Sequence, residues 1–130
     1  MAQKVSHLLL NHEQIDSDHE YFCQLVLQLK AATNSEFSEL FNTLIEHLEK
    51  HFHYEQTLMR ESRYPGINEH AGEHTRVINE LHNFNKRVEV GRLSMAKAYI
   101  NSTIFDWFNL HINNMDAALV AHLNKINATA

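Results

Sequence analysis

The chain has 130 residues, of which 44% are hydrophobic and 21% are charged, and this length suits one domain, 1–130, with a single hydrophobic core. Three glycines and one proline are too few for a turn-rich β protein. The single cysteine excludes an internal disulfide and a c-type haem, and it favours a reducing, cytoplasmic location. The net charge of −5 disfavours nucleic acid and anionic membrane surfaces as partners, and no apolar run approaches the roughly 18 residues that insert into a membrane.

Apolar residues recur at helical spacing in four long segments. A short arm, 1–14, precedes the first segment, which runs over about 16–32. Its apolar stripe consists of Phe22, Leu25, Val26 and Leu29. Thr33-Asn34-Ser35 then breaks the pattern and offers N-cap side chains to the next helix.

The second segment, about 36–62, keeps an apolar stripe close to a bundle heptad over its whole length. Tyr64-Pro65-Gly66 ends it, because proline cannot continue a helix. The third segment starts near Ile67 and runs through Val88, and Gly91 is its natural C-terminal cap.

The fourth segment starts near Ser94, and Asn113-Asn114 predicts a local irregularity within it. Three turns of about three or four residues place each helix antiparallel to the one before it. The sequence therefore predicts an all-α, antiparallel up-down-up-down four-helix bundle over about 15–125.

Polar side chains interrupt the apolar stripes where a bundle core is expected. The seven are His19, His51, Glu55, His70, His74, His111 and Asp116. His51 and Glu55 are four residues apart and share a helix face, and the same holds for the histidine pair of the third helix. Asp116 follows His111 by five residues, about 140° around an ideal α-helix, so we expect it to approach the core from beside the stripe.

The turn positions predict that these polar groups lie at one depth. In an antiparallel pair, two residues are level when their mean position falls on the connecting turn. The means are about 35 for His19 and His51, about 62.5 for Glu55 and His70, and about 92.5 for His74 and His111, each on or beside a break. Because unpaired burial would cost roughly several kcal/mol for each group, we expect the seven side chains to converge.

Five imidazoles and two carboxylates in an apolar core indicate a metal site with more ligands than one ion needs. A tetrahedral zinc ion would be satisfied by four of them. Two ions that share both carboxylates and a bridging oxo or hydroxo group use all seven. One ion then has three histidines and six ligands, and the other has two histidines, five ligands and an open position. The residues expected to wall that position are Phe22, Phe52, Trp107 and Phe108, which suits a small apolar molecule such as O₂.

The motifs follow one another in a specific order. They are Ile15-Asp16-Ser17-Asp18-His19, His51-Phe52-His53-Tyr54-Glu55 leading to Met59, Tyr64-Pro65, His70 with His74, and Trp107 with His111-Ile112 and Asp116. Over roughly 15–120 this order resembles the haemerythrin family, and most closely its single-domain bacterial members. The resemblance implies two iron ions bridged by Glu55, Asp116 and an oxo or hydroxo group.

The same resemblance assigns His70, His74 and His111 to the six-coordinate iron, and His19 and His51 to the five-coordinate one. It implies reversible O₂ binding at the open position, with two electrons from the iron pair and a proton from the bridging hydroxide. Phe108 stands where the family frequently has leucine, and Gln56 where it frequently has glutamate. The arm also lacks the aromatic residues that the family often has there. These departures leave the ligands intact and bear on O₂ access, affinity and autoxidation.

The remaining histidines are expected at the surface or near the termini: His7, His12, His53, His82 and His122. His47 is a separate case, because it lies one turn before His51 on the same stripe and level with Cys23. Ordinary packing or support of a ligand is the preferred interpretation of His47. A second metal or redox pair with Cys23 is the alternative.

The preferred function is a reversible O₂-binding protein that stores, delivers or buffers O₂, with an O₂-consuming protein as candidate recipient. The alternatives are a sensor of O₂, NO or redox state that acts through a partner protein, a diiron peroxidase or NO-scavenging enzyme, and metal sequestration. Ferritin-like oxidases are disfavoured, because they need Glu-x-x-His pairs and no histidine here has a glutamate three residues before it. A histidine-rich site also favours reversible binding over O–O cleavage, because it supplies little anionic charge to high-valent iron.

Overall fold

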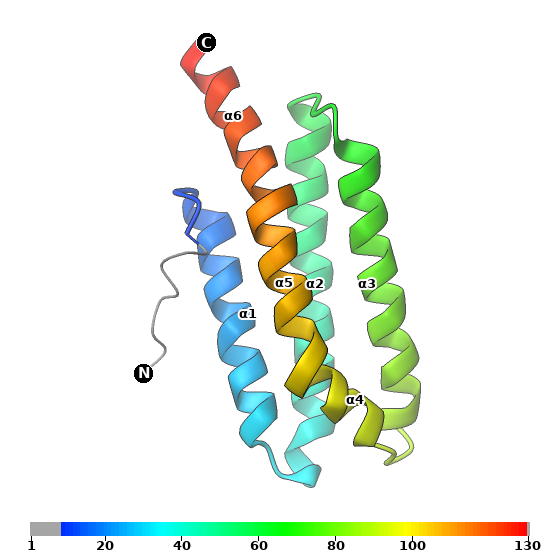
Figure 1. Cartoon of the computed structure of the whole chain (residues 1–130). Helices are drawn as coiled ribbons and strands as arrows, with labels where there is room; N and C mark the ends of the chain where they lie inside the picture. The colour runs from blue at the N-terminus through cyan, green and yellow to red at the C-terminus, as the bar shows by residue number, and fades with distance from the viewer. Residues whose placement is uncertain (1–8, 130) are drawn as a thin grey trace.

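Four helical segments run alternately up and down and form one bundle (Figure 1). The structure, a computed structural model, describes residues 9–129, so His7 and Leu8 of the predicted arm lie outside it. The first three segments are α1 (Glu13–Ala31), α2 (Asn34–Glu61) and α3 (Ile67–Val88). The fourth consists of α4 (Ser94–Ala98), the π-helix η2 (Tyr99–Thr103), α5 (Ile104–His111), the π-helix η3 (Ile112–Asp116) and α6 (Ala117–Thr129), which follow one another without a break. The predicted all-α four-helix bundle is confirmed.

Helix α1 begins earlier than its apolar stripe predicts, because polar side chains organise its first turn. Nδ1 of His12 accepts a hydrogen bond from the backbone N–H of Ile15 at 3.2 Å, which caps the helix. The carboxylate of Asp16 accepts two more, from the backbone N–H groups of Leu10 at 2.8 Å and His12 at 3.1 Å. His12, expected as a surface residue, is therefore the N-cap of α1.

The turn between α1 and α2 forms as its sequence predicts. Thr33 and Glu36 make a capping box, in which the Glu36 carboxylate accepts a hydrogen bond from the backbone N–H of Thr33 at 2.9 Å. After α2, Arg63 adopts a φ of 55°, and the backbone N–H of Tyr64 donates to the carbonyl oxygen of Met59 at 2.9 Å. This left-handed residue ends the helix just before Pro65.

The turn after α3 contains the predicted glycine cap. Gly91 has a φ of 83°, a conformation that glycine adopts without steric cost, and the backbone N–H of Arg92 donates to the carbonyl oxygen of Arg87 at 2.9 Å. Ser94 was predicted to cap the fourth segment, but it is instead the first residue of α4 and makes no capping hydrogen bond. The N-cap position belongs to Leu93.

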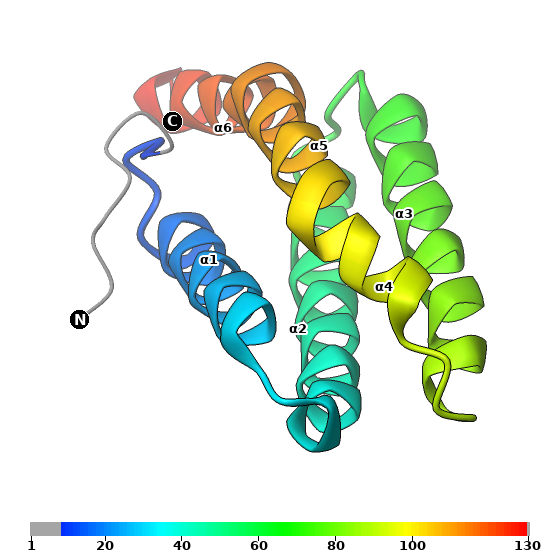
Figure 2. The ribbon, with the colours of Figure 1, turned by 60° about the horizontal axis from the view of Figure 1, so that its bottom comes forward.

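The α1–α2 and α3–α4 turns lie at the same end of the bundle (Figures 1 and 2), and a large part of the apolar core is built from residues near this end. Phe37 and Phe41 of α2 stack there with ring centroids 5.6 Å apart, and both side chains are fully buried together with Leu81 of α3. Ile100 of η2 closes this core from the fourth segment. The other half of the bundle contains the polar side chains together with buried apolar residues such as Ile15, Met59 and Leu119.

Replacing Phe41 by alanine is expected to destabilise the metal-free protein by about 3–5 kcal/mol, because a fully buried aromatic ring is lost and a cavity remains. Urea unfolding followed by circular dichroism measures the change. Leu27→Ala is the control, since Leu27 is 54% exposed and its truncation is expected to cost no more than about 0.5 kcal/mol. Equal effects of the two variants would contradict this packing.

Candidate metal centre

The structure brings all seven predicted polar residues together in the second half of the bundle. Helix α1 supplies His19, α2 supplies His51 and Glu55, α3 supplies His70 and His74, and the fourth segment supplies His111 at the end of α5 and Asp116 at the end of η3. Each of the seven residues is at most 5% exposed. Their ligand atoms form two groups that share both carboxylates.

Three histidines make up the larger group, together with Glu55 and Asp116. The Nε2 atom of His111 lies 3.2 Å from Nε2 of His70 and 3.1 Å from Nε2 of His74. Oδ1 of Asp116 lies 3.0 Å from Nε2 of His70 and 3.1 Å from that of His111. Oε1 of Glu55 lies 3.2 Å from Nε2 of His74. The five ligand atoms therefore face one common point.

Five of the separations in this group, at 3.0–3.2 Å, are close to those expected around a six-coordinate ion, whereas Nε2 of His70 and Oε1 of Glu55 lie 3.7 Å apart. Adjacent corners of an octahedron with bonds of about 2.1–2.2 Å are about 3.0–3.1 Å apart. A tetrahedral zinc ion with bonds of about 2.0–2.1 Å would need about 3.3–3.4 Å between its ligand atoms. The larger group therefore has the spacing and the mixed nitrogen–oxygen chemistry of a first-row transition-metal site.

The smaller group contains His19 and His51 with the same two carboxylates. Oδ2 of Asp116 lies 3.0 Å from Nε2 of His19, so the two oxygens of Asp116 face different groups. Nε2 of His51 lies 3.5 Å from Oε1 of Glu55. The donor set thus divides into three imidazoles on one side and two on the other, with both carboxylates between them.

Asp116 reaches the core directly rather than from beside the apolar stripe, which corrects our expectation for this residue. The expectation assumed an ideal α-helix after His111, in which five residues turn through about 500° and leave an offset of about 140°. The chain instead forms the π-helix η3 over Ile112–Asp116. A π-helix closes its hydrogen bonds between residues five apart, so Asp116 lies on the same face as His111. The irregularity predicted at Asn113-Asn114 falls within this turn.

Burial and neighbouring groups shift the pKa values of several residues in the cluster. Burial, and then the nearby charge of Asp116, raises the pKa of Glu55 well above its ordinary value. Burial also acts to raise the pKa of Asp116, but the imidazoles of His111, His19 and His70 beside its carboxylate lower it well below its ordinary value. Burial and repulsion by the neighbouring imidazoles lower the pKa of His74 to about 2, so this ring is neutral and available as a ligand.

The residues present fit a pair of metal ions. Neither oxygen of Glu55 receives a hydrogen bond, and neither does Oδ1 of Asp116, although all three atoms are buried. Buried carboxylate oxygens without donors are costly unless a cation binds them. Imidazole nitrogens at the separations given above complete a donor set typical of iron, zinc or copper rather than of magnesium or calcium.

Aromatic rings surround the cluster where the sequence places them. The ring of Phe52 stacks on His74 with centroids 3.9 Å apart, and Trp107 stacks on His111 at 4.8 Å. Phe108 meets the edge of His19 at 5.3 Å and stacks on Phe22 at 3.9 Å, so Phe22 forms a second layer behind it. Trp107 is only half-buried, because its indole N–H reaches outward to Glu73 at 2.6 Å.

Sequence reasoning assigned no role to Asp18, which contacts the cluster directly. Its Oδ2 accepts a hydrogen bond from Nδ1 of His51 at 2.8 Å, and its backbone carbonyl accepts one from Nε2 of His47 at 2.9 Å. The turn rule contained this signal, since the mean of positions 18 and 51 also falls near residue 35. His47 therefore supports a ligand, which was its preferred interpretation, and its ring nitrogen bonds to Asp18 rather than to Cys23.

The other histidines lie away from the cluster. His53 is exposed, and His82 is an exposed residue 3.6 Å from Glu49. His122 is half-buried, because its Nε2 donates to the backbone carbonyl of Ser62 at 2.9 Å and so ties α6 to the end of α2. These three positions match the surface or terminal placement that the sequence predicts.

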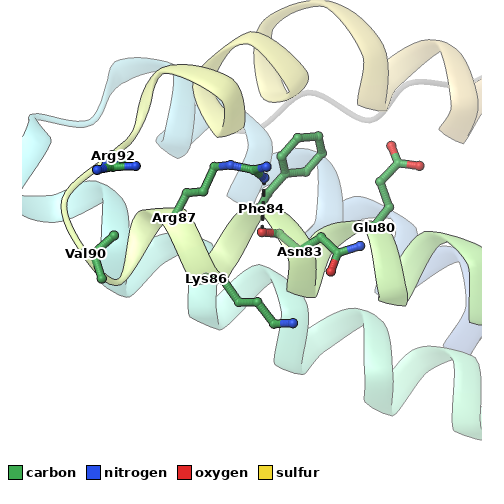
Figure 3. Close-up of a pocket in the computed structure, with 7 residues that line it drawn as sticks. All are labelled: Glu80, Asn83, Phe84, Lys86, Arg87, Val90 and Arg92. Carbon is green, nitrogen blue, oxygen red and sulfur yellow. Dashed lines mark hydrogen bonds between the residues drawn. The ribbon is translucent and has the colours of Figure 1, made fainter.

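The cluster does not lie in an open cavity. A surface cavity of about 550 Å³ is found at the far end of α3, where its basic side chains, Lys86, Arg87 and Arg92, do not converge on one point (Figure 3). None of the seven polar residues lines it. A second cavity of about 270 Å³, between α2 and α3, has Phe52 and His74 in its lining. Phe52 and His74 are thus the part of the centre nearest to a surface groove.

The fold and the buried donor set define an all-α protein with a cation-binding centre in the bundle core. The chain belongs to the hemerythrin family: the profile described as "Hemerythrin HHE cation binding domain" matches residues 10–123. It is 25% identical to the "Bacteriohemerythrin" of Ralstonia nicotianae (strain ATCC BAA-1114 / GMI1000) over 116 residues, which cover 89% of this chain and 84% of that relative. No solved structure matches the chain. Within residues 9–129, none of the helices is both long and apolar enough to cross a membrane.

Acid is expected to destabilise the metal-free protein through His74. The folded ring stays neutral down to its pKa of about 2, whereas an unfolded histidine takes up a proton below its ordinary pKa of 6.5. The unfolded state therefore binds more protons between these values, and this contribution to the free energy of unfolding falls as the pH drops below about 6.5. Urea unfolding at several pH values with a chelator present measures the slope. His74→Phe should reduce it, and an unchanged slope would contradict the assignment.

Proposed function

We propose that this protein binds O₂ reversibly at a non-haem diiron centre, for storage, delivery or buffering of O₂. The observation that carries the proposal is the division of seven buried ligand atoms into a group with three imidazoles and a group with two, which share Glu55 and Asp116. Membership of the hemerythrin family and the similarity to a bacteriohemerythrin support iron as the metal and O₂ as the ligand.

In this proposal the residues have distinct tasks. His70, His74 and His111 hold one ion, His19 and His51 hold the other, and both carboxylates bridge the pair together with an oxo or hydroxo group. When bound, the ferrous pair supplies the two electrons that O₂ takes up and returns on release. The two-histidine group offers fewer protein ligands than the three-histidine group, so the exchangeable position lies there.

The aromatic residues keep that position dry and apolar. Phe108 covers His19 edge-on, with Phe22 behind it, and Phe52 covers His74 from the side of the surface groove. Phe52 and Phe108 are at most 4% exposed. Excluding water from a bound O₂ favours its release as O₂ over protonation and irreversible oxidation of the metals. A donor set of five imidazoles and two carboxylates also supplies less negative charge than the carboxylate-rich sites of oxidases, so we propose binding rather than an enzymatic reaction.

The central test is the visible spectrum of the iron-loaded, anaerobically reduced protein before and after exposure to air. We expect two irons per chain and a new ligand-to-iron absorption band that appears with O₂ and disappears on deoxygenation. Oxidation without a reversible band would refute O₂ storage. Sustained turnover of peroxide or NO above the rate of free iron would favour an enzyme, and an O₂-dependent complex with another protein would favour a sensor.

Phe108→Leu is expected to accelerate both association and dissociation of O₂ severalfold, because a smaller side chain beside His19 opens space over the exchangeable position. Stopped-flow mixing of the reduced protein with O₂ measures both rates. Phe84→Leu is the control, because Phe84 packs on Tyr99 near the far end of the bundle and should leave the rates unchanged. Unchanged rates in Phe108→Leu would place the O₂ path elsewhere.

A further inference from the structure

The five ligand imidazoles differ in what holds the ring nitrogen that points away from the cluster. Nδ1 of His51 donates to the Asp18 carboxylate at 2.8 Å. The Nδ1 atoms of the other four, His19, His70, His74 and His111, are buried and have no hydrogen-bond partner within residues 9–129. The outer hydrogen bond that ligand histidines in proteins usually make is thus present at one imidazole of the five, and that imidazole belongs to the two-histidine group.

Asp18 is itself held in place from several directions. Its Oδ1 accepts a hydrogen bond from the Gln14 side chain at 2.9 Å, and its backbone carbonyl accepts one from His47 at 2.9 Å. The ring of His47 lies nearly parallel to that of His51, at 14° and 6.2 Å between centroids. Asp18 follows the first turn of α1 and contacts two histidines of α2, so it joins the two helices that supply the smaller ligand group.

We propose that Asp18 is a positioning residue that retains the metal ion at the two-histidine position. Its carboxylate fixes the proton of His51 on Nδ1, which leaves the lone pair of Nε2 free for the metal, and its negative charge strengthens that nitrogen as a donor. The two-histidine position has one imidazole fewer than its neighbour, so it depends more on each one. This inference rests on the two-ion centre of the proposed function.

The test is the affinity of each position for metal, measured with Co²⁺ in place of iron under chelator competition. Asp18→Asn keeps the shape of the side chain and removes its charge. We expect one of the two ions to bind about 10–100-fold more weakly than in the unaltered protein, while the other is unaffected. Five-coordinate Co²⁺ absorbs more strongly than six-coordinate Co²⁺, so the spectrum identifies the ion that leaves first.

Two further variants separate this role from general effects of charge or folding. Asp18→Glu keeps a carboxylate at this position, so its affinity for the weaker ion should lie between those of Asp18→Asn and the unaltered protein. Glu80 of α3 accepts a hydrogen bond from Arg76 at 3.2 Å and belongs to neither ligand group. Glu80→Gln removes one carboxylate away from the centre, so it should leave the affinities for both ions unchanged. The retained ion at the three-histidine position shows that the Asp18 variants are folded.

The proposal would be overturned if Asp18→Asn weakened the affinity for Co²⁺ equally at both positions, or if it changed the affinity at neither. An unaltered protein that takes up a single ion would refute it together with the diiron centre. An unaltered protein that takes up two ions but does not bind O₂ would refute only the proposed function. Selective loss of the weaker ion would still support the role of Asp18 in that case.

Discussion

The burial of two carboxylates in the core of a helical bundle is the constraint on which this structure depends. Glu55 and Asp116 are at most 1% exposed, and both oxygens of Glu55 and Oδ1 of Asp116 lack hydrogen-bond donors. Such a pair is unfavourable in an apolar interior unless cations bind it. Burial also lowers the pKa of His74 and of His51, so these two rings add ligand atoms without adding charge. The donor set of the bundle core therefore fits a metal site.

The asymmetry of the centre follows from how the helices share their residues. Helix α3 contributes two histidines one turn apart, and the fourth segment adds His111 to the same group. Helices α1 and α2 contribute only one histidine each to the other group. A centre with three histidines in one ligand group and two in the other differs from a symmetric site for metal storage. The hydrogen bond from His51 to Asp18 lies on the side of the two-histidine group.

Local sequence signals succeeded where the physics is local. Apolar periodicity identified the four segments, and the capping box at Thr33 and the glycine at position 91 fixed two of the turns. The turn rule then placed three pairs of polar residues at one level, because rigid antiparallel helices convert sequence distance into depth. The direction of Asp116 was predicted wrongly, because the prediction assumed an ideal α-helix after His111. It also started α1 too late, because the hydrogen bonds that begin this helix come from His12 and Asp16.

The amino-acid sequence by itself determined the helical bundle, the order of its turns and the set of polar residues that meet inside it. These features depend on periodicity and spacing, which can be read along a single chain. The tertiary structure decided the details that depend on contacts between segments. The chain forms a π-helix after His111, and Asp116 therefore faces both ligand groups. Asp18 accepts the hydrogen bond from the outer nitrogen of His51. Apolar periodicity does not fix a wider helical turn or a hydrogen bond between two helices, because only the packed bundle brings these groups together.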